Sequence, residues 1–173
     1  MRLARLTQGF AVALAFALGA HAHAQAQYAT VGFSPGNAID LVLETIQGAR
    51  REIDMAAYEF TSSKIADALV AAHERGVNVR VMADAQENRG KGYSKIYTLV
   101  RHGIAVRLNS RYAVQHNKFC VVDGAAVETG SFNYTRAAET KNAENVVVIR
   151  DRKLAGEYHT EFERLWKESE PAR

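Results

Sequence analysis

Six residues between positions 116 and 133 combine a potential nucleophile, a positive charge and small polar groups. The pattern is H-x-K-x(4)-D-x(6)-G-S-x-N, formed by His116, Lys118, Asp123, Gly130, Ser131 and Asn133. At background residue frequencies, it would arise by chance in about one chain per million of this length. We therefore interpret these residues as parts of one site.

The spacing and the types of these residues indicate a particular chemistry. His116 and Lys118 lie two residues apart, so on a strand their side chains point to the same face. An imidazole can act as a nucleophile or an acid–base group, and Lys118 adds a positive charge beside it. Ser131 and Asn133 can donate hydrogen bonds, and Gly130 permits close approach of the backbone. Together they fit a tetrahedral oxyanion, above all a phosphodiester.

Alternating helices and strands must position these residues. Apolar spacing predicts helices over residues 37–50, 93–102 and 154–167. A further helix is predicted between the capping residues 61–63 and a stop at Gly76. Strands are predicted over residues 53–60, 77–81, 104–108, 118–122, 126–129 and 145–149. Asp123-Gly124 predicts a tight turn between two of the strands. This order predicts a single-domain α/β fold, a mixed sheet with helices on both faces.

The first 26 residues are typical of a secretory signal peptide. Arg2 and Arg5 precede an apolar run over residues 10–20, and Ala-x-Ala patterns follow at 22–24 and 24–26. The run is too short for a membrane span, which needs about 20 residues. We therefore expect an exported protein, periplasmic or secreted, with residues 27–173 as the mature domain and no stable membrane anchor after cleavage.

The composition excludes several classes of protein. Apolar residues make up 47% and charged residues 24%, which is typical of a globular domain rather than a disordered chain. The single Cys120 excludes an internal disulfide and any site built from several cysteines. Removing Arg2 and Arg5 with the leader lowers the formal charge from +3 by two units to +1. Evidence for a polyanionic partner must therefore come from local charge.

A segment rich in positive charge precedes the motif and extends into it. Residues 88–122 contain no Asp or Glu but seven Lys or Arg, with tyrosines interleaved. This composition is typical of a nucleic-acid groove, although a solvated positive face without a partner is the alternative. The candidate substrate-binding residues are Arg89, Lys91, Lys95, Arg111 and Tyr112. No pattern for reading base edges is present, so we expect low sequence specificity.

The motif resembles the His-Lys-Asp signature of the phospholipase D superfamily. Segments 33–35 and 58–61 also resemble the amino-terminal half of that family, and residues 130–149 are most similar to its small, single-motif bacterial endonucleases. A complete family site needs two motifs, whereas this chain carries one. The resemblance therefore implies a phospholipase D-like fold and a homodimer in which two copies of His116 meet.

The resemblance also implies catalytic roles. One His116 would attack phosphorus and form a phosphohistidine. The second copy of His116 would protonate the leaving oxygen and then activate water. Lys118, Ser131 and Asn133 would hold the non-bridging oxygens. Because Lys118 and imidazolium would supply the positive charge, no metal and no other cofactor is expected.

Two carboxylates complete the expected set. The resemblance gives Glu144 the role of hydrogen-bonding His116 and fixing its tautomer. Asp123 is the third residue of the signature. We expect it to have a structural role, because a turn residue just past the strand should lie away from the phosphate.

These observations favour an exported, metal-independent endonuclease of low sequence specificity that acts as a homodimer. DNA is the expected substrate, with RNA as the alternative. A second hypothesis is a phospholipase D or another small phosphodiesterase, because the motif itself does not distinguish between phosphodiesters. A third is a non-catalytic nucleic-acid-binding module, which the intact His116 disfavours. The small domain and the basic span favour the nuclease.

Overall fold

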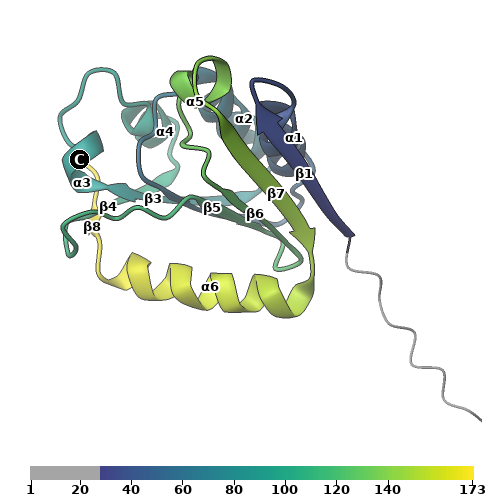
Figure 1. Ribbon diagram of the computed structural model, residues 1–173. Coiled ribbons are helices and arrows are strands. Elements are labelled where there is room, and N and C mark those ends of the chain that lie inside the picture. The colour runs from purple at the N-terminus through teal and green to yellow at the C-terminus, as the bar shows by residue number, and fades with distance from the viewer. Residues whose placement is uncertain (1–27) are drawn as a thin grey trace, which may run out of the picture.

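An eight-stranded mixed sheet forms the centre of the structure (Figure 1). The computed structural model describes residues 28–173, and the predicted signal peptide, residues 1–26, lies outside the described residues. The strand order is β1-β7-β6-β5-β2-β3-β4-β8. The strands are β1 (Tyr28–Ser34), β2 (Glu52–Ala57), β3 (Asn78–Asp84), β4 (Ala105–Asn109), β5 (Phe119–Val122), β6 (Ala126–Gly130), β7 (Glu144–Arg150) and β8 (Glu170–Pro171). Only β2, β3 and β4 pair in parallel, which confirms the predicted mixed sheet.

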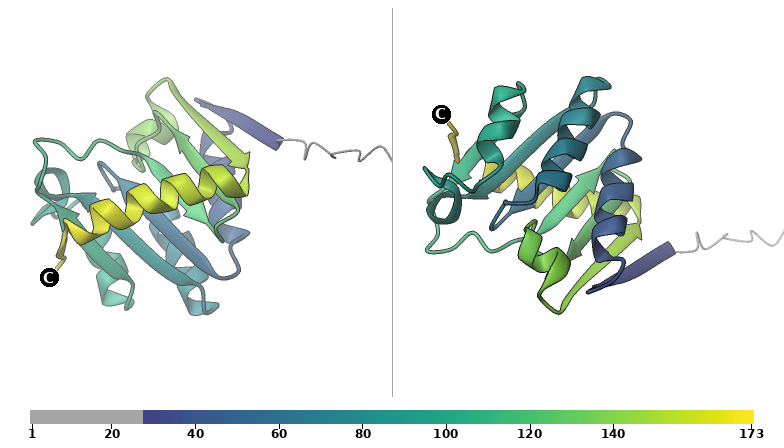
Figure 2. Two further views of the ribbon diagram at one scale, coloured as in Figure 1. Left: turned by 90° about the horizontal axis from the view of Figure 1, so that it is seen from below. Right: turned by 90° about the horizontal axis from the view of Figure 1, so that it is seen from above.

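Helices cover both faces of the sheet, as predicted. α1, α2 and α4 lie on one face, and α6 crosses the other face diagonally (Figure 2). The helices are α1 (Ala38–Gln47), α2 (Ser63–Glu74), α3 (Ala85–Asn88), α4 (Ile96–Arg101), α5 (Arg136–Thr140) and α6 (Arg152–Lys167). Ser62 caps α2, because its hydroxyl accepts a hydrogen bond from the N–H of Ile65. Within residues 28–173, none of these helices has the length and apolarity that a membrane span requires.

Side-chain alternation along the central strands divides the core into two layers. Met55 and Ala57 of β2 face the layer under α1 and α2, whereas Ala56 faces α6. Leu69 of α2 and Phe162 of α6 are fully buried in these two layers. Each such side chain contributes about 1.5–3 kcal/mol to folding. This packing fixes the strand ends from which the site is built.

Several elements differ from the prediction. β1, α3, α5 and β8 were not predicted, because they are short or lack a clear apolar period. The strand expected over 53–60 ends at Ala57, and Phe60 instead forms an isolated bridge with Tyr134. The helix expected over 93–102 is limited to α4. The predicted turn is confirmed, since Asp123 and Gly124 have positive φ angles of 55° and 60°.

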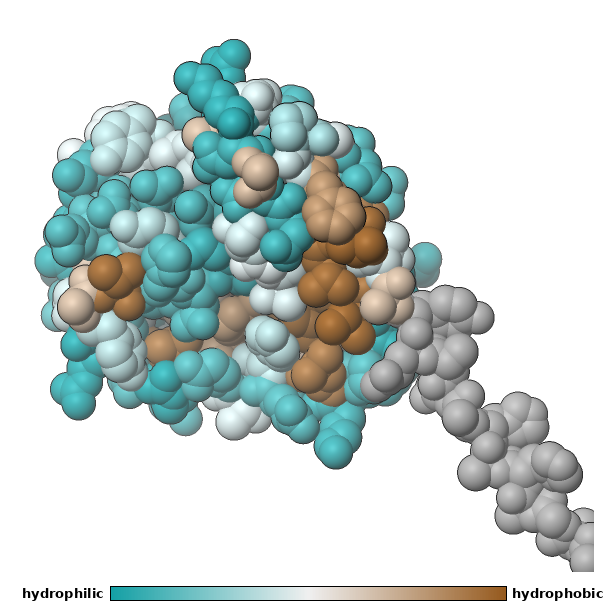
Figure 3. Space-filling model, in the orientation of Figure 1, coloured by the Kyte–Doolittle hydropathy of each residue, from teal (hydrophilic) through white to brown (hydrophobic). Residues whose placement is uncertain are grey.

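α6 leaves part of its face of the sheet uncovered. Alternation along β1 turns Val31 and Phe33 toward this face, with exposed fractions of 52% and 58%. The apolar strip, as we call this surface, consists of Ala29, Val31, Phe33, Val147 and Ile149 on the neighbouring strands β1 and β7. It forms a continuous hydrophobic band in Figure 3. Bands of this kind are typical of surfaces that contact another molecule.

The motif residues are divided between the two ends of the sheet. β2 and β6 end where β5 and β7 begin, because β5 is antiparallel to β2 and β7 is antiparallel to β6. His116 and Lys118 precede β5, and Ser131 and Asn133 follow β6, so they gather at this end. Asp123 follows β5 and lies at the opposite end of the sheet. Along an extended strand, it would be about 16 Å from Lys118.

Candidate active site

His116 lies in the segment that leads into β5, and the neighbouring Gln115 holds this segment in place. The side chain of Gln115 donates a hydrogen bond to the carbonyl of Ala57 (3.0 Å) and accepts one from the N–H of Asn117 (2.9 Å). The N–H of Gln115 donates to the buried carboxylate of Asp84 (2.8 Å). Gln115 therefore fixes the backbone on both sides of His116, while the imidazole remains exposed.

Tyr58, just after β2, contacts both predicted catalytic side chains. Its ring centroid lies 4.6 Å from that of His116, in a tilted arrangement. The Lys118 ammonium lies 5.0 Å from the same ring, within the range of a cation–π interaction. Sequence reasoning assigned Tyr58 no role in the site. The signal available was its place at the end of a buried strand.

Lys118 is almost completely buried, although it carries a charged group. Its ammonium donates a hydrogen bond to the carbonyl of His116 (2.7 Å), which ties the two residues together. Burial lowers the pKa of Lys118, and the nearby carboxylates of Glu144 and Glu59 oppose this shift. The ammonium has three donors. Two of them are left for a substrate oxygen.

Ser131 and Glu144 form a second polar group at the same end of the sheet. The Ser131 hydroxyl donates to Glu144 Oε2 (2.5 Å) and accepts from the N–H of Asn145 (3.0 Å). Gly130 allows the ends of β6 and β7 to lie this close together, because a Cβ at this position would lie 2.2 Å from the carbonyl oxygen of Asn145. The hydroxyl is therefore oriented by β7.

The expected hydrogen bond between Glu144 and His116 is not formed within the single chain. Glu144 Oε2 accepts from Ser131, and Oε1 accepts from the side chain of Asn142 (2.9 Å). Within one chain both carboxylate oxygens of Glu144 are therefore occupied, and β6 lies between β7 and the strand that follows His116.

Asn133 lies in the loop between β6 and α5. Its side-chain oxygen is buried and has no hydrogen-bond partner among the described residues. A buried polar atom without a partner is uncommon in folded proteins. The next residue, Tyr134, anchors the loop, because its carbonyl accepts hydrogen bonds from the N–H groups of Thr61 and Ser62 (3.0 Å each).

Asp123 organises the opposite end of the sheet. Its carboxylate accepts hydrogen bonds from the N–H groups of Arg50, Arg51 and Glu52, with the shortest at 2.8 Å. Burial opposes ionisation, but these donors and the charge of Arg51 hold the pKa of Asp123 below its ordinary value. Asp123 therefore joins the β5–β6 turn to the start of β2.

The predicted basic groove is partly neutralised. Arg89 forms an ion pair with Glu170 (3.4 Å), and the Tyr112 hydroxyl donates to Glu168 (2.8 Å). Tyr112 also accepts a hydrogen bond from Arg164. By contrast, the three remaining candidates form no ion pair with a described residue. They are Lys91, Lys95 and Arg111.

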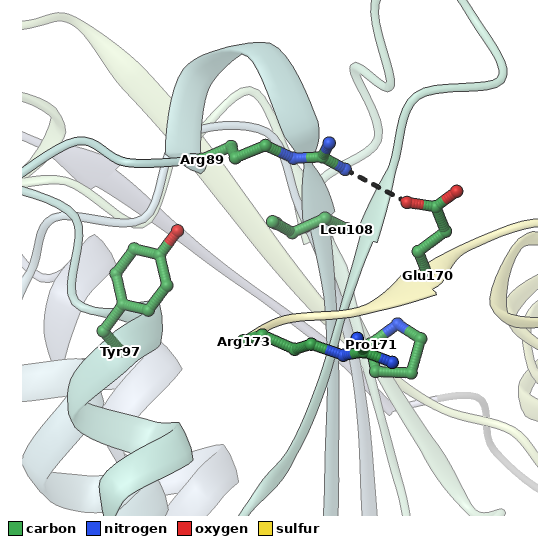
Figure 4. Close-up of a pocket in the computed structure, with 6 residues that line it drawn as sticks. All are labelled: Arg89, Tyr97, Leu108, Glu170, Pro171 and Arg173. Atoms are coloured by element: carbon green, nitrogen blue, oxygen red, sulfur yellow. Dashed lines mark hydrogen bonds and ion pairs between the residues drawn. The ribbon is translucent and has the colours of Figure 1, made fainter.

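A pocket of about 400 Å³ lies beside this region (Figure 4). Arg89 and Tyr97 line it from one side, and Glu170 and Arg173 line it from the C-terminal segment. None of the residues of the His-Lys-Asp pattern lines this pocket. His116, Lys118, Ser131 and Asn133 instead lie at the end of the sheet where β5 and β7 begin.

The geometry defines what the site can do. An exposed imidazole, a buried ammonium and an oriented hydroxyl lie at one end of the sheet, as expected for a group that holds a tetrahedral anion. Among residues 28–173, His, Cys, Asp and Glu side chains form no group of three that could hold a metal ion. Sequence reasoning missed the residues that position His116, namely Tyr58, Gln115 and Asp84.

Comparison with known proteins gives consistent matches. A family model described as "Cardiolipin synthase, PLD-like domain" matches residues 42–166. The chain is 39% identical over 136 residues to the mitochondrial cardiolipin hydrolase of Xenopus laevis, covering 79% of this chain and 64% of that protein. It is 40% identical over 124 residues to the phospholipase D of Rickettsia prowazekii, covering 72% of this chain and 60% of that protein. The chain thus spans less than two thirds of the length of these relatives.

Solved structures also match the fold. Nuc from Salmonella typhimurium, a phospholipase D family member, superposes with a TM-score of 0.81 at 42% identity. The match covers 85% of this chain and 99% of that chain. NucT from Helicobacter pylori gives a TM-score of 0.79 at 20% identity, covering 84% of this chain and 99% of that chain, a likeness of fold alone.

Proposed function

Because this chain belongs to the phospholipase D superfamily, we propose that it is an endonuclease that hydrolyses nucleic-acid phosphodiester bonds with low sequence specificity. The observation that carries this proposal is the convergence of His116, Lys118, Ser131 and Asn133 at one end of the sheet. These side chains supply a nucleophile, a fixed cation and hydrogen-bond donors around one position.

The proposed reaction has two steps. The His116 imidazole attacks phosphorus, so that a P–N bond forms while the P–O bond to the leaving group breaks. A second imidazole donates a proton to the leaving oxygen. That imidazole then takes a proton from water, whose oxygen attacks phosphorus and releases His116. Lys118 stabilises the non-bridging oxygens in both steps, and we propose that turnover needs no metal ion.

The second imidazole comes from a second copy of the chain in this proposal. The other described histidines are His73 and His102, beside the far ends of α2 and α4, and His159, which bonds to Asp54 under α6. The apolar strip supports a contact between copies, because it reaches the site end of the sheet and α6 leaves it exposed. A two-fold axis near His116 would bring two such sites together.

The substrate class has one alternative. Relatives at about 40% identity are named phospholipase D and mitochondrial cardiolipin hydrolase, and a lipid phosphodiester presents the same reacting group. The cations at Lys91, Lys95 and Arg111, which form no ion pairs with described residues, support a longer polyanion. DNA is the proposed substrate, and RNA is the second candidate. We also propose export to the periplasm or the medium, from the leader at residues 1–26.

Nicking of supercoiled plasmid by the purified mature chain in excess EDTA tests this proposal. We expect cleavage by the wild type and none by His116→Ala, which loses both chemical roles of the imidazole. Hydrolysis of phosphatidylcholine without plasmid cleavage would favour the lipid alternative. Cleavage that stops in EDTA would contradict the metal-independent mechanism. Equal cleavage by His116→Ala would contradict the assignment of the nucleophile.

A further inference from the structure

A buried carboxyl group lies in the strand that leads to the site. Glu128 of β6 is 1% exposed and faces the core layer that also contains Cys120. Its Oε2 accepts a hydrogen bond from the Tyr134 hydroxyl (2.7 Å), whereas Oε1 has no partner among the described residues. Carboxyl groups are rarely buried in this way, because removing the charged form from water is costly.

Glu128 and Tyr134 enclose the loop that carries two of the site residues. Ser131 and Asn133 lie between them in the chain, and Tyr134 is fully buried. The phenol–carboxyl bond therefore closes the loop across its base. The Tyr134 carbonyl also binds the N–H groups at the start of α2, which leaves this residue little freedom.

The same strand is connected to Lys118. The Thr129 hydroxyl, next to Glu128, donates a hydrogen bond to the Lys118 carbonyl (3.0 Å). Phe119, which follows Lys118, pairs with Thr129 in the β5–β6 ladder. A shift of β6 would therefore move the ammonium and the loop together.

We propose that Glu128 and Tyr134 form a positioning pair that holds Ser131 and Asn133 in place for the reacting phosphodiester. This inference rests on the proposed function, and neither residue contacts the substrate. Ionised Glu128 accepts a stronger hydrogen bond from Tyr134 than the neutral acid does, so the loop is held most firmly when Glu128 is charged.

The electrostatic surroundings set the pH range of this effect. Burial raises the pKa of Glu128 to about 7, and the hydrogen bond from Tyr134 opposes the shift. The other titratable group beside it is the Cys120 thiol on β5, whose pKa is raised by burial and by Glu128. On β7, the residue paired with Glu128 is the apolar Val148.

Glu128→Gln is an informative variant, because glutamine has the shape of the protonated acid and no charge. With a small phosphodiester such as bis(p-nitrophenyl) phosphate, we expect kcat/KM of this variant to match the wild type well below pH 7. Well above pH 7 we expect roughly a tenfold loss, in line with the cost of a small misplacement. A loss that is the same at every pH, or no loss, would overturn the proposal.

A second measurement does not need activity. In a His116→Ala background, which has no catalytic activity to support, we expect the amide NMR signals of Ser131 and Asn133 to shift with a midpoint near pH 7. Glu128→Gln should abolish this step, and Tyr134→Phe should move it to higher pH. Tyr158→Phe, on the opposite face of the sheet, is the matched control and should leave it unchanged. If the pH-dependent shift of these amide signals were unchanged in Glu128→Gln, the proposal would be overturned. This outcome does not depend on whether the enzyme is a nuclease.

Discussion

The ring of Tyr58 lies 4.6 Å from the ring of His116 and 5.0 Å from the ammonium of Lys118. One partly buried aromatic side chain thus contacts both the proposed nucleophile and the proposed cation. We expect Tyr58→Leu to lower kcat/KM about 10- to 100-fold, because the imidazole loses its packing surface and the ammonium loses a cation–π contact. Steady-state kinetics with a small phosphodiester measures this effect.

Tyr58→Phe is the matched control for this prediction. It keeps the ring and removes only the hydroxyl, so it should retain activity within about threefold. A large loss in Tyr58→Phe would show that the hydroxyl, rather than the ring, has the main role. Full activity in Tyr58→Leu would contradict the positioning role of the ring.

Much of the fold could be predicted from local patterns. Strands such as β3 and β7 alternate or are nearly continuous in Val and Ile, and α6 has a clear helical period. β1 could not be predicted in the same way, because its residues Gly32 and Ser34 face α1 while the apolar Val31 and Phe33 are exposed. Its pattern is inverted relative to an ordinary edge strand.

The sequence predicted the candidate reactive residues but not the residues that support them. His116, Lys118, Ser131 and Asn133 follow a spaced pattern along the chain, whereas Gln115 and Tyr58 act through contacts between strands that are distant in sequence. No spacing rule relates Gln115 to the carbonyl of Ala57, or Glu128 to Tyr134. The expected bond from Glu144 to His116 is not formed within one chain, where Ser131 and Asn142 bind the carboxylate, and it stays a prediction for a site shared by two copies.

Asp123 should matter for stability and not for the chemical step. We expect Asp123→Ala to lower the free energy of unfolding by about 2–4 kcal/mol, because three backbone N–H donors lose a charged acceptor. Since the pKa is lowered in the folded state, this stabilisation is present above the ordinary value of 3.8 and is lost as pH falls through the folded value. Urea denaturation at pH 7 and at pH 3 measures it.

The control for Asp123 is the rate at a temperature where the variant is folded. There, kcat should stay within about threefold of the wild type, because the carboxylate is about 16 Å from Lys118 along the strand. A loss of several orders of magnitude in folded protein would place Asp123 in the chemistry instead.

Glu128 should make the protein less stable as pH rises. Its pKa is about 7 in the folded chain against an ordinary 4.5, so the folded state binds the proton more tightly. Stability should therefore fall between about pH 4.5 and pH 7 and then level off, by about 3 kcal/mol in total. Glu128→Gln should lose this slope, which urea denaturation at pH 5 and pH 8 can measure. A conservative change of the exposed Glu157 to Gln is the matched control, and an unchanged slope in Glu128→Gln would contradict the prediction.

The apolar strip should govern association of the chain. Val31 and Phe33 are more than half exposed on the face that α6 leaves open, and Phe33 pairs with Asn145, whose N–H binds Ser131. A charge at Phe33 would have to be buried in a contact between two copies, at a cost of several kcal/mol. We expect Phe33→Asp to shift sedimentation from dimer to monomer and to abolish cleavage, although circular dichroism shows a folded chain. Tyr93→Asp changes another exposed aromatic outside the strip and should remain dimeric. A Phe33→Asp dimer would place the interface elsewhere, whereas an active monomer would contradict the shared site itself.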